Sequence, residues 1–507
     1  MGGMIFQNLR FKGLVLGLES CAAKICAYAN IGILCFLVFV LTGLIAVNQY
    51  ILHAFMNSAD EHSCLFLAEC LRLGKWWVPT HPLQEFFDVV HVGNRGGKWF
   101  SVYPPGWPIL LAVGLKFQIQ DWINPILSVG ALGLLFLTGR KIFGTSVTWI
   151  ALLLTALTPF FAFTSAAYYS HSTCLFTMAF FCYAYGRWKD CGGVSQRLLW
   201  GALMALAIGY GLMTRYLTMA FFAAPFLICH FWPVLRKQRK MQTGDWVMIG
   251  ILAGFMTVIY YQNYTVSGNL FKAPNRYDKS WERLGFMDDY TPLDATIYVF
   301  ARFFYLMDWA PPLFPILFLL SLFQKRTWTV EQRFFQWAFF SSVIAYFFYF
   351  SWGGNQYGPR YYYEGFPFLV FSMVDGLRCW WKEGKDSQRQ FLAGVLILSL
   401  GTAVYQFYKQ GRFYEEVSRQ RKALYALAEQ EIRNPAIVFI RGQFLGQTLV
   451  MSRDDAIRNH PLLKGKILYA RDLEEKNESL KAFFPARDYY LGSYDRAALK
   501  AVLEKLP

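Results

Sequence analysis

The chain has 507 residues, of which 55% are hydrophobic, 19% aromatic and only 16% charged. This composition excludes an ordinary soluble domain, because the apolar residues recur in runs of about 20, the length that spans a bilayer. The formal net charge of +16 does not indicate a nucleic-acid partner, because the basic residues are spread over short loops between the apolar runs. The ten cysteines show no CxxC spacing, so neither a zinc ribbon nor a disulfide framework is expected.

Apolar runs of spanning length predict a polytopic helical membrane protein with about 11 transmembrane helices. Residues 1–28 are mixed in character and are expected to be cytoplasmic or interfacial. The first span is too long for the apolar core of a signal peptide, and no small-residue cleavage site follows it. Ile297–Met307 is a candidate partial twelfth span. The predicted spans are Ala29–Leu52, Trp122–Ile142, Val147–Tyr168, Thr173–Gly186, Leu198–Met213, Tyr216–Trp232, Trp246–Tyr264, Pro311–Phe323, Phe334–Phe350, Tyr361–Leu377 and Phe391–Tyr408.

The short loops rich in Lys and Arg indicate the orientation, because such loops face the cytoplasm. Arg236, Lys237, Arg239 and Lys240 share one of them. If the N-terminus is cytoplasmic, the acid-rich first loop and the C-terminal tail are both expected on the outer face.

The stretch Ser58–Pro108 lies between apolar runs, carries many ionisable and aromatic residues, and is longer than a connection requires. Ser58 followed three residues later by Glu61 is a capping-box pattern, and an apolar stripe continues from there to Gly74. We therefore predict a short amphipathic helix just outside the bilayer, with Asp60 in its first turn.

Asp60 and Glu61 admit two interpretations. Acids in the first turn of a helix stabilise its dipole, and Glu61 also completes the capping box. An acid at the membrane surface can also serve as a general base toward a lipid-borne substrate.

The predicted outer loops carry six cations: Arg95, Lys98, Arg215, Arg276, Arg302 and Arg360. Arg215 and Arg360 adjoin apolar runs, where a charge is costly and usually has a partner. For both, one interpretation is a side chain that snorkels to the interface or forms a salt bridge, for instance between Arg360 and Glu364 four residues on. The other is an arginine that binds an anionic lipid phosphate, which guanidinium geometry suits. The histidines His62, His81, His91 and His171 fit no metal-binding spacing and are expected to be hydrogen-bonded or solvated.

The tail changes character after Tyr408. Phe413–Ile432 has a charged helical pattern, and short apolar stretches follow at Ala436–Ile440, Lys466–Ala470 and Asp488–Leu491. Short strands that alternate with helices predict a small C-terminal α/β domain outside the membrane. The predicted domains are therefore a transmembrane domain, 1–408, whose outer loop 53–121 holds the candidate active site, and a soluble domain, 409–507.

The ordered set of motifs resembles the GT-C superfamily of membrane glycosyltransferases. Within it, the chain is similar to the bacterial branch related to protein O-mannosyltransferases and lipid A aminoarabinose transferases. The resemblance covers nearly the whole chain, and no single motif carries it alone. The motifs are the acidic pair at 60–61, YPPGWP at 103–108, GRKIFG at 139–144, SAAYYSHST at 165–173, LMTRYLT at 212–218, GNLFKAPNRYD…RLGF at 268–286, GGNQYGPRYYYEGFP at 353–367, ARDL at 470–473 and FPARDYY at 484–490.

The resemblance implies inverting transfer of a sugar from a polyprenyl-phosphate donor to an acceptor glycan, lipid or protein, at the outer face of a bacterial inner membrane. Asp60 matches the catalytic base, and Glu61 would position it or a metal. Arg215, Arg360 and His171 would neutralise the leaving phosphate, and Tyr103, Tyr357 and Lys98 would contact the substrates. A divalent cation is an open possibility, for which the sequence offers only the pair Asp288 and Asp289.

Two other classes of function stay open. A lipid or glycan transporter or flippase would show broken helices, charged residues near mid-span and often repeated halves, and no such repeat is found. A scaffold would use its outer tail to bind a partner, and the acids of the outer loop would only cap helices.

Overall fold

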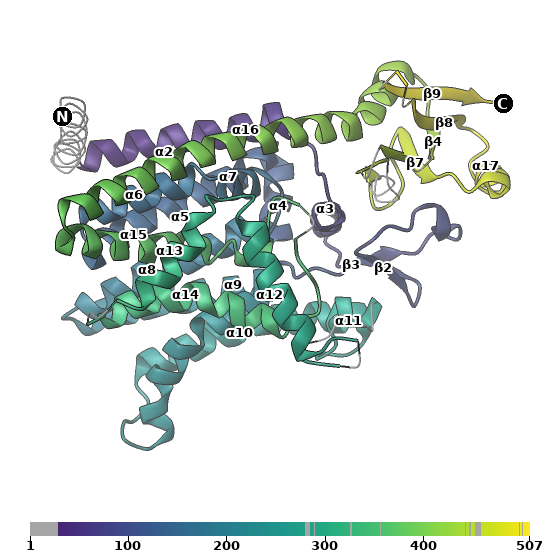
Figure 1. Ribbon diagram of the computed structural model, residues 1–507. Coiled ribbons are helices and arrows are strands. Elements are labelled where there is room, and N and C mark those ends of the chain that lie inside the picture. Colours follow the sequence, from purple (N-terminus) through teal and green to yellow (C-terminus); the bar gives the residue numbers. More distant parts are fainter. Residues whose placement is uncertain are drawn as a thin grey trace, which may run out of the picture.

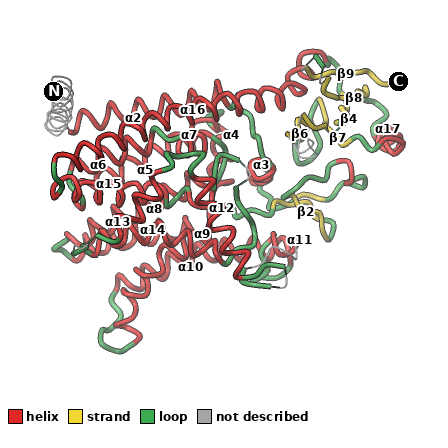
Figure 2. Tube along the Cα trace, in the orientation of Figure 1, coloured by secondary structure: helices red, strands yellow, loops and turns green. Residues whose placement is uncertain are grey.

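The computed structural model describes residues 29–507 except 279–283, 288, 325, 326, 355, 442, 446, 447, 452–457, 496 and 499. The predicted interfacial segment 1–28 lies outside the described residues. Helices form a large bundle, and the strands gather beyond one end of it, next to the short helix α3 (Figures 1 and 2). The chain is an integral, multi-pass membrane protein, as its composition predicts.

Within the described part of the chain, five helices are long and apolar enough to cross a membrane, or six if one bent pair counts as a single span. Several other predicted spans correspond to shorter or more polar helices, so the predicted number of about 11 stays a prediction. The five are α2 (Ala29–Ala46) with the π-helical turn η1 (Val47–Ile51), α5 (Gln120–Ile142), α9 (Val194–Leu235), α10 (Thr243–Ser267) and α16 (Asp386–Glu431). The others near the bundle are α8 (His171–Asp190), α11 (Pro274–Asp278), α12 (Pro292–Leu306), α13 (Leu313–Leu322), α14 (Val330–Phe347) and α15 (Phe366–Glu383).

Two predicted spans are not straight helices. The span predicted at Val147–Tyr168 is a bent pair, α6 (Thr145–Ala156) and α7 (Pro159–Ala166), with an angle of 65° between them. Pro159 has no N–H to continue α6, and it sits at the start of α7 after the capping residue Thr158.

The spans predicted at Leu198–Met213 and Tyr216–Trp232 are the two arms of α9, which breaks at Arg215 (φ −143°, ψ 79°). A Cβ placed on Gly211 would lie only 2.7 Å from Met219 Cγ, so the two arms approach each other across the break. The break therefore brings Arg215 to a turn between two helical arms.

The first outer loop contains the predicted amphipathic helix, α3 (Ala59–Arg72), followed by Gly74 with φ +68°. Downstream, β1 (Val78–Pro79), β3 (Lys98–Ser101) and β2 (Val92–Arg95) form an antiparallel sheet in that order, with the 3₁₀ turn η2 (Gln84–Phe86) between β1 and β2. The apolar helix α4 (Gly106–Phe117) then leads back toward the bundle.

The C-terminal sheet contains the three strands expected from the sequence. β4 (Ala436–Ile440) is parallel to β7 (Ile467–Arg471) and to β8 (Asp488–Asp495), and β9 (Lys500–Leu506) is antiparallel to β8. The remaining elements here are β5 (Gln443–Leu445), β6 (Thr448–Met451), η5 (Glu474–Lys476) and α17 (Asn477–Phe483).

The domain boundary predicted at residues 408 and 409 falls inside α16, which continues for 46 residues without interruption. The apolar span and the charged helix predicted at Phe413–Ile432 are therefore one helix, because no Pro or capping residue separates them.

The C-terminal sheet and the first outer loop share one hydrophobic core. Phe66 and Trp99 of the loop lie in the same buried cluster as Ile437, Phe439 and Leu468 of the sheet. The rings of Phe66 and Trp99 are 4.6 Å apart, which ties α3 to β3 inside this cluster. One face of the sheet therefore packs against the loop, and the other face packs against the end of α16, where Leu424 and Ala428 lie in one buried cluster with Val438.

Phe439→Ala tests this shared core. Phe439 is fully buried, so its truncation should lower the free energy of unfolding by about 3–5 kcal/mol. Because the core is shared, trypsin should then cleave the first outer loop as well as the tail. Both changes can be followed in detergent micelles by thermal unfolding and limited proteolysis. Phe271→Ala is the matched control, because Phe271 is 78% exposed. Cleavage confined to the tail would contradict a shared core.

Candidate active site

Helix α3 begins at Ser58 because this residue caps it. Ser58 Oγ accepts a hydrogen bond from Glu61 N (3.2 Å), and Ser58 has an extended backbone. The Glu61 carboxylate in turn accepts from Ser58 Oγ (2.9 Å) and from Asn57 N (2.9 Å). The predicted cap by Ser58 is present, but the return bond of a full capping box is not, because the Glu61 carboxylate accepts from Asn57 N in place of Ser58 N. These bonds fix the orientation of the first turn of α3.

Glu61 also connects α3 to the bundle. Its second carboxylate oxygen accepts from Tyr168 N (2.8 Å), beyond the end of α7, and the side chain is fully buried. Burial raises the pKa of the Glu61 carboxyl to about 7, although the hydrogen bonds from Tyr168, Ser58 and Asn57 oppose this change. Glu61 therefore anchors the helix that carries Asp60, and its carboxylate is occupied by backbone and hydroxyl donors.

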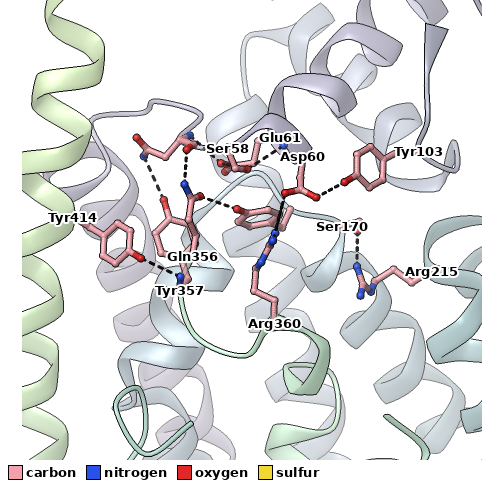
Figure 3. Close-up of polar contacts among 12 residues, drawn as sticks. Ser58, Asp60, Glu61, Tyr103, Ser170, Arg215, Gln356, Tyr357, Arg360 and Tyr414 are labelled. Carbon is pink, nitrogen blue, oxygen red and sulfur yellow. Dashed lines mark hydrogen bonds and ion pairs between the residues drawn. The ribbon is translucent and has the colours of Figure 1, made fainter. Parts of the chain in front are cut away.

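Asp60, one residue earlier, points the other way, toward charged and aromatic groups (Figure 3). Arg360 Nη1 and Nη2 each lie 3.4 Å from Asp60 Oδ2, and the Tyr103 hydroxyl donates to Asp60 Oδ1. Burial alone would raise the pKa of the Asp60 carboxyl, but Arg360, His91 and Tyr103 outweigh it and hold this pKa well below its usual range. The Asp60 side chain keeps 26% of its surface exposed, so a substrate can reach it.

Arg360 is held in place by its own loop. It begins the 3₁₀ turn η3 (Arg360–Tyr362), and its N–H donates to the carbonyls of Gly358 (2.9 Å) and Gly353 (3.2 Å). Gly358 has φ +92°, and a Cβ there would lie 2.8 Å from the Phe160 ring, so only glycine fits this turn. The guanidinium carbon of Arg360 lies 4.3 Å from the centre of the Tyr169 ring, a cation–π contact.

Arg302 also holds the loop that leads from α14 to Arg360. It is fully buried and donates to the carbonyls of Tyr346 (2.9 Å), Ser351 (2.8 Å) and Trp352 (3.0 Å). The sequence placed Arg302 among the outer cations. The structure shows that its charge fixes the chain between α14 and η3.

A second cluster joins Arg215, His171 and Glu364. Arg215 Nε forms an ion pair with Glu364 Oε1 (2.8 Å), and His171 Nδ1 lies 3.0 Å from the same oxygen. Glu364 is therefore the partner of Arg215 and not, as suggested for a salt bridge, of Arg360, whose partner is Asp60. Arg215 also donates to the Tyr346 hydroxyl (2.6 Å) and lies 3.4 Å from Ser170 Oγ (Figure 3).

Two predicted substrate-binding residues have other contacts. Tyr357 is fully buried, has φ +55°, and packs its ring 4.7 Å from that of Tyr414 on α16, while its hydroxyl accepts from Asn57 Nδ2 (3.3 Å). Lys98 donates to the carbonyls of Thr265 (2.6 Å) and Val266 (3.2 Å), at the C-terminal end of α10. The structure brings together Asp60, Tyr103 and Arg360, with Glu61, Arg215 and His171 around them, and it gives Tyr357 and Lys98 packing and capping contacts.

Sequence reasoning missed the aromatic residues that surround the two arginines. The rings of Tyr346 and Tyr361 are stacked at 4.0 Å, and Arg215 lies 5.8 Å from each ring. Tyr169 packs against Arg360. The run of tyrosines at 361–363 and the pair at 168–169 were visible signals, but an aromatic residue beside an apolar run is most often a membrane-interface residue.

The described residues offer few metal ligands. No group of three or more His, Cys, Asp or Glu side chains among them lies close enough to hold a metal ion. His62 Nε2 lies 2.8 Å from the Met56 carbonyl, and His81 stacks on Phe484. Of the predicted acidic pair, Asp288 lies outside the described residues and Asp289 is in an exposed turn.

The buried Glu61 carboxyl predicts a pH-dependent stability. Its pKa of about 7 in the folded protein exceeds the ordinary value of 4.5, so between these values the folded protein holds a proton that the unfolded chain has lost. The free energy of unfolding should therefore fall as the pH rises from 4.5 to 7, by about 3 kcal/mol, and this contribution should not change further above pH 7. Thermal unfolding in micelles should show this slope in the wild type and not in Glu61→Gln. Glu69→Gln, on the same helix, is the control, and equal slopes in all three proteins would contradict the assignment.

Comparisons with known proteins were made by sequence and by structure. No protein-family model matches the sequence, and no relative among the curated proteins was found. Among solved structures, the chain is similar to ArnT from Cupriavidus metallidurans bound to undecaprenyl phosphate, with a TM-score of 0.57 and 12% identity over 94% of this chain and 98% of that one. The same protein in the apo state gives a TM-score of 0.56 at 12% identity, with the same coverage. This likeness shows the fold: over nearly its whole length the chain folds as ArnT does, in agreement with the fold that the sequence resemblance implies.

Proposed function

We propose that the protein is an inverting glycosyltransferase that moves a sugar from a polyprenyl-phosphate donor to an acceptor. The observation that carries the proposal is that Asp60 contacts both Arg360 and Tyr103, close to a second arginine, Arg215. One carboxylate that can accept a proton thus lies beside guanidinium groups that can hold a phosphate. The likeness in fold to a protein whose structure contains undecaprenyl phosphate supports the same class of donor.

The reaction balances with the residues present. An acceptor hydroxyl oxygen attacks the anomeric carbon, the bond from that carbon to the phosphate oxygen breaks, and the polyprenyl phosphate leaves with the bonding electrons. Asp60 takes the proton of the acceptor hydroxyl, and Arg360 and Arg215 stabilise the charge that grows on the departing phosphate. Tyr103 holds the second oxygen of Asp60, so that one oxygen faces the acceptor.

Arg360 pairs with Asp60 before the donor binds and holds the donor phosphate afterwards. Its contacts to Asp60 of 3.4 Å are longer than the 2.7–2.9 Å typical of a tight charge-assisted hydrogen bond. A donor phosphate therefore competes with Asp60 for the guanidinium. When the phosphate takes that charge, the pKa of Asp60 rises toward its usual value and the carboxylate becomes a stronger base. Donor binding thus prepares Asp60 for the acceptor.

The arrangement in the membrane belongs to the same proposal. About 11 spans would place the Asp60 site and the C-terminal α/β unit on the outer face of a bacterial inner membrane. The acceptor, a glycan, lipid or protein, would arrive from that side, and no nucleic acid takes part. The proposed steps use only side chains of this chain, and none of them is assigned to a divalent cation.

Asp60→Asn should lower transfer by about 10²–10⁴-fold, because the amide cannot accept the proton. The assay uses membranes that contain the variant, a polyprenyl-phosphate sugar and an extract of surface glycans and lipids, with mass spectrometry of the products. Glu69→Gln, a neutral replacement on the same helix away from Arg360, should keep full activity.

The same variant separates an enzyme from a transporter. The break in α9 and the bend between α6 and α7 are features that transporters also show. Transfer at the wild-type rate in Asp60→Asn would remove this carboxylate from the mechanism. Lipid movement across the membrane without any transfer product, in either protein, would favour a flippase.

Substitutions at the Asp60–Arg360 ion pair should change donor binding in opposite directions. Arg360→Gln removes a phosphate-binding group and should weaken binding of undecaprenyl phosphate by about tenfold or more. Asp60→Asn removes the carboxylate that competes with the phosphate for Arg360, so it should strengthen binding of undecaprenyl phosphate. Binding can be measured in micelles by native mass spectrometry, with Arg276→Gln, an exposed arginine, as control. Weaker binding in both variants would contradict the competition.

A further inference from the structure

A cavity of about 780 Å³ lies at the end of the bundle opposite Asp60. It is lined by the C-terminal ends of α5 and α8 and by the start of α14. Helix α8 starts at His171, which belongs to the Asp60 side, and ends at Asp190, which lines the cavity. At 1.5 Å per residue its 20 residues cover about 30 Å, the thickness of the hydrocarbon layer. The cavity and the candidate active site therefore lie near opposite faces of the membrane.

The charges around the cavity are unequal. Arg140, Lys141, Arg187 and Lys189 line it, together with the two acids Asp190 and Glu331. Each acid forms an ion pair with a lysine: Lys141 pairs with Asp190, and Lys189 pairs with Glu331. These two ion pairs link α5 to α8 and α8 to α14, so they hold the helices around the cavity.

The two arginines are left to face the cavity without a carboxylate. Among the described residues, neither Arg140 nor Arg187 forms an ion pair. The guanidinium carbon of Arg140 lies 5.6 Å from the Phe136 ring centre, and that of Arg187 lies 5.4 Å from the Trp200 ring centre. A guanidinium on an aromatic face keeps its outer N–H donors available, and their geometry matches two oxygens of a phosphate.

The rest of the wall is mixed. Leu137, Phe334 and Phe335 give it an apolar part, and Thr138, Thr145, Tyr183, Tyr185 and Thr329 add hydroxyl groups. A water-soluble anion would gain nothing from the apolar part, whereas the glycerol and first acyl carbons of a phospholipid would cover it. We propose that this cavity binds the headgroup of an anionic phospholipid of the inner leaflet, with its phosphodiester on Arg140 and Arg187. The site is separate from the proposed transfer site and needs no donor or acceptor.

Native mass spectrometry of the full chain in micelles tests the site, with phosphatidylglycerol and phosphatidylcholine as probes. The wild type should retain phosphatidylglycerol in preference to phosphatidylcholine. The variant Arg140→Gln/Arg187→Gln should lose about tenfold or more of its affinity for phosphatidylglycerol. The control, Arg236→Gln/Lys240→Gln, removes two charges from another loop at the same end and should change the affinity less than twofold.

A second variant leaves every charge in place. Gly186 lines the cavity, and a Cβ there would meet no atom within 4 Å. Gly186→Leu should therefore place an apolar side chain inside the cavity, raise the helix propensity of α8 and reduce phosphatidylglycerol binding. Unchanged binding in both cavity variants would overturn the proposal. So would competition by inorganic phosphate or by glycerophosphoglycerol that is as strong as that by the intact lipid, because the cavity would then bind a soluble phosphate. Loss of transfer in Asp60→Asn has no bearing on this result, so the two proposals can fail separately.

Discussion

The ion pair between Asp60 and Arg360 is the interaction on which the site depends. A buried guanidinium is costly unless its charge is matched, and Arg360 is only 7% exposed. Asp60 matches that charge, but at 3.4 Å it does so loosely, and the Tyr169 ring supplies the rest of the contact. The pair therefore holds Arg360 inside the protein, and its length fits the proposal that a donor phosphate can replace Asp60 at the guanidinium. A closer pair would favour the fold at the expense of binding.

Arg215 shows the opposite arrangement. Its partner Glu364 is fully buried and lies at 2.8 Å, and His171 and Tyr346 complete the surroundings. Such a pair keeps its geometry, because removal of either member leaves a buried charge unmatched. The candidate site thus combines a closely paired cation, Arg215, with a more loosely paired one, Arg360. The loop that carries the second is itself fixed, by Arg302 and by the turn at Gly358.

Local features of the sequence predicted local features of the structure. The cap at Ser58, the amphipathic helix that ends before Gly74 and the strands at 436–440, 466–470 and 488–491 depend on neighbouring residues, and they were found within a few positions. The pairing of Arg215 with Glu364 could not be found in this way, because it joins residues 149 positions apart through the break in α9. For the same reason Arg360 was matched to the nearby Glu364 and not to Asp60, which lies 300 positions away.

The core shared by the C-terminal sheet and the loop helps to fix the position of Asp60. Phe66 and Leu67 of α3 belong to the core that the sheet completes, and Cys64 and Ala68, on another face of α3, pack with Trp107 and Leu111 of α4. The helix that carries Asp60 is thus packed between the C-terminal sheet and α4. Its first turn is also tied to Tyr168 through Glu61. An isolated helix this short would be marginally stable and would not hold a carboxylate in one position. Packed on two faces and anchored at its first turn, α3 instead keeps Asp60 within reach of Arg360, which lies 300 positions further along the chain.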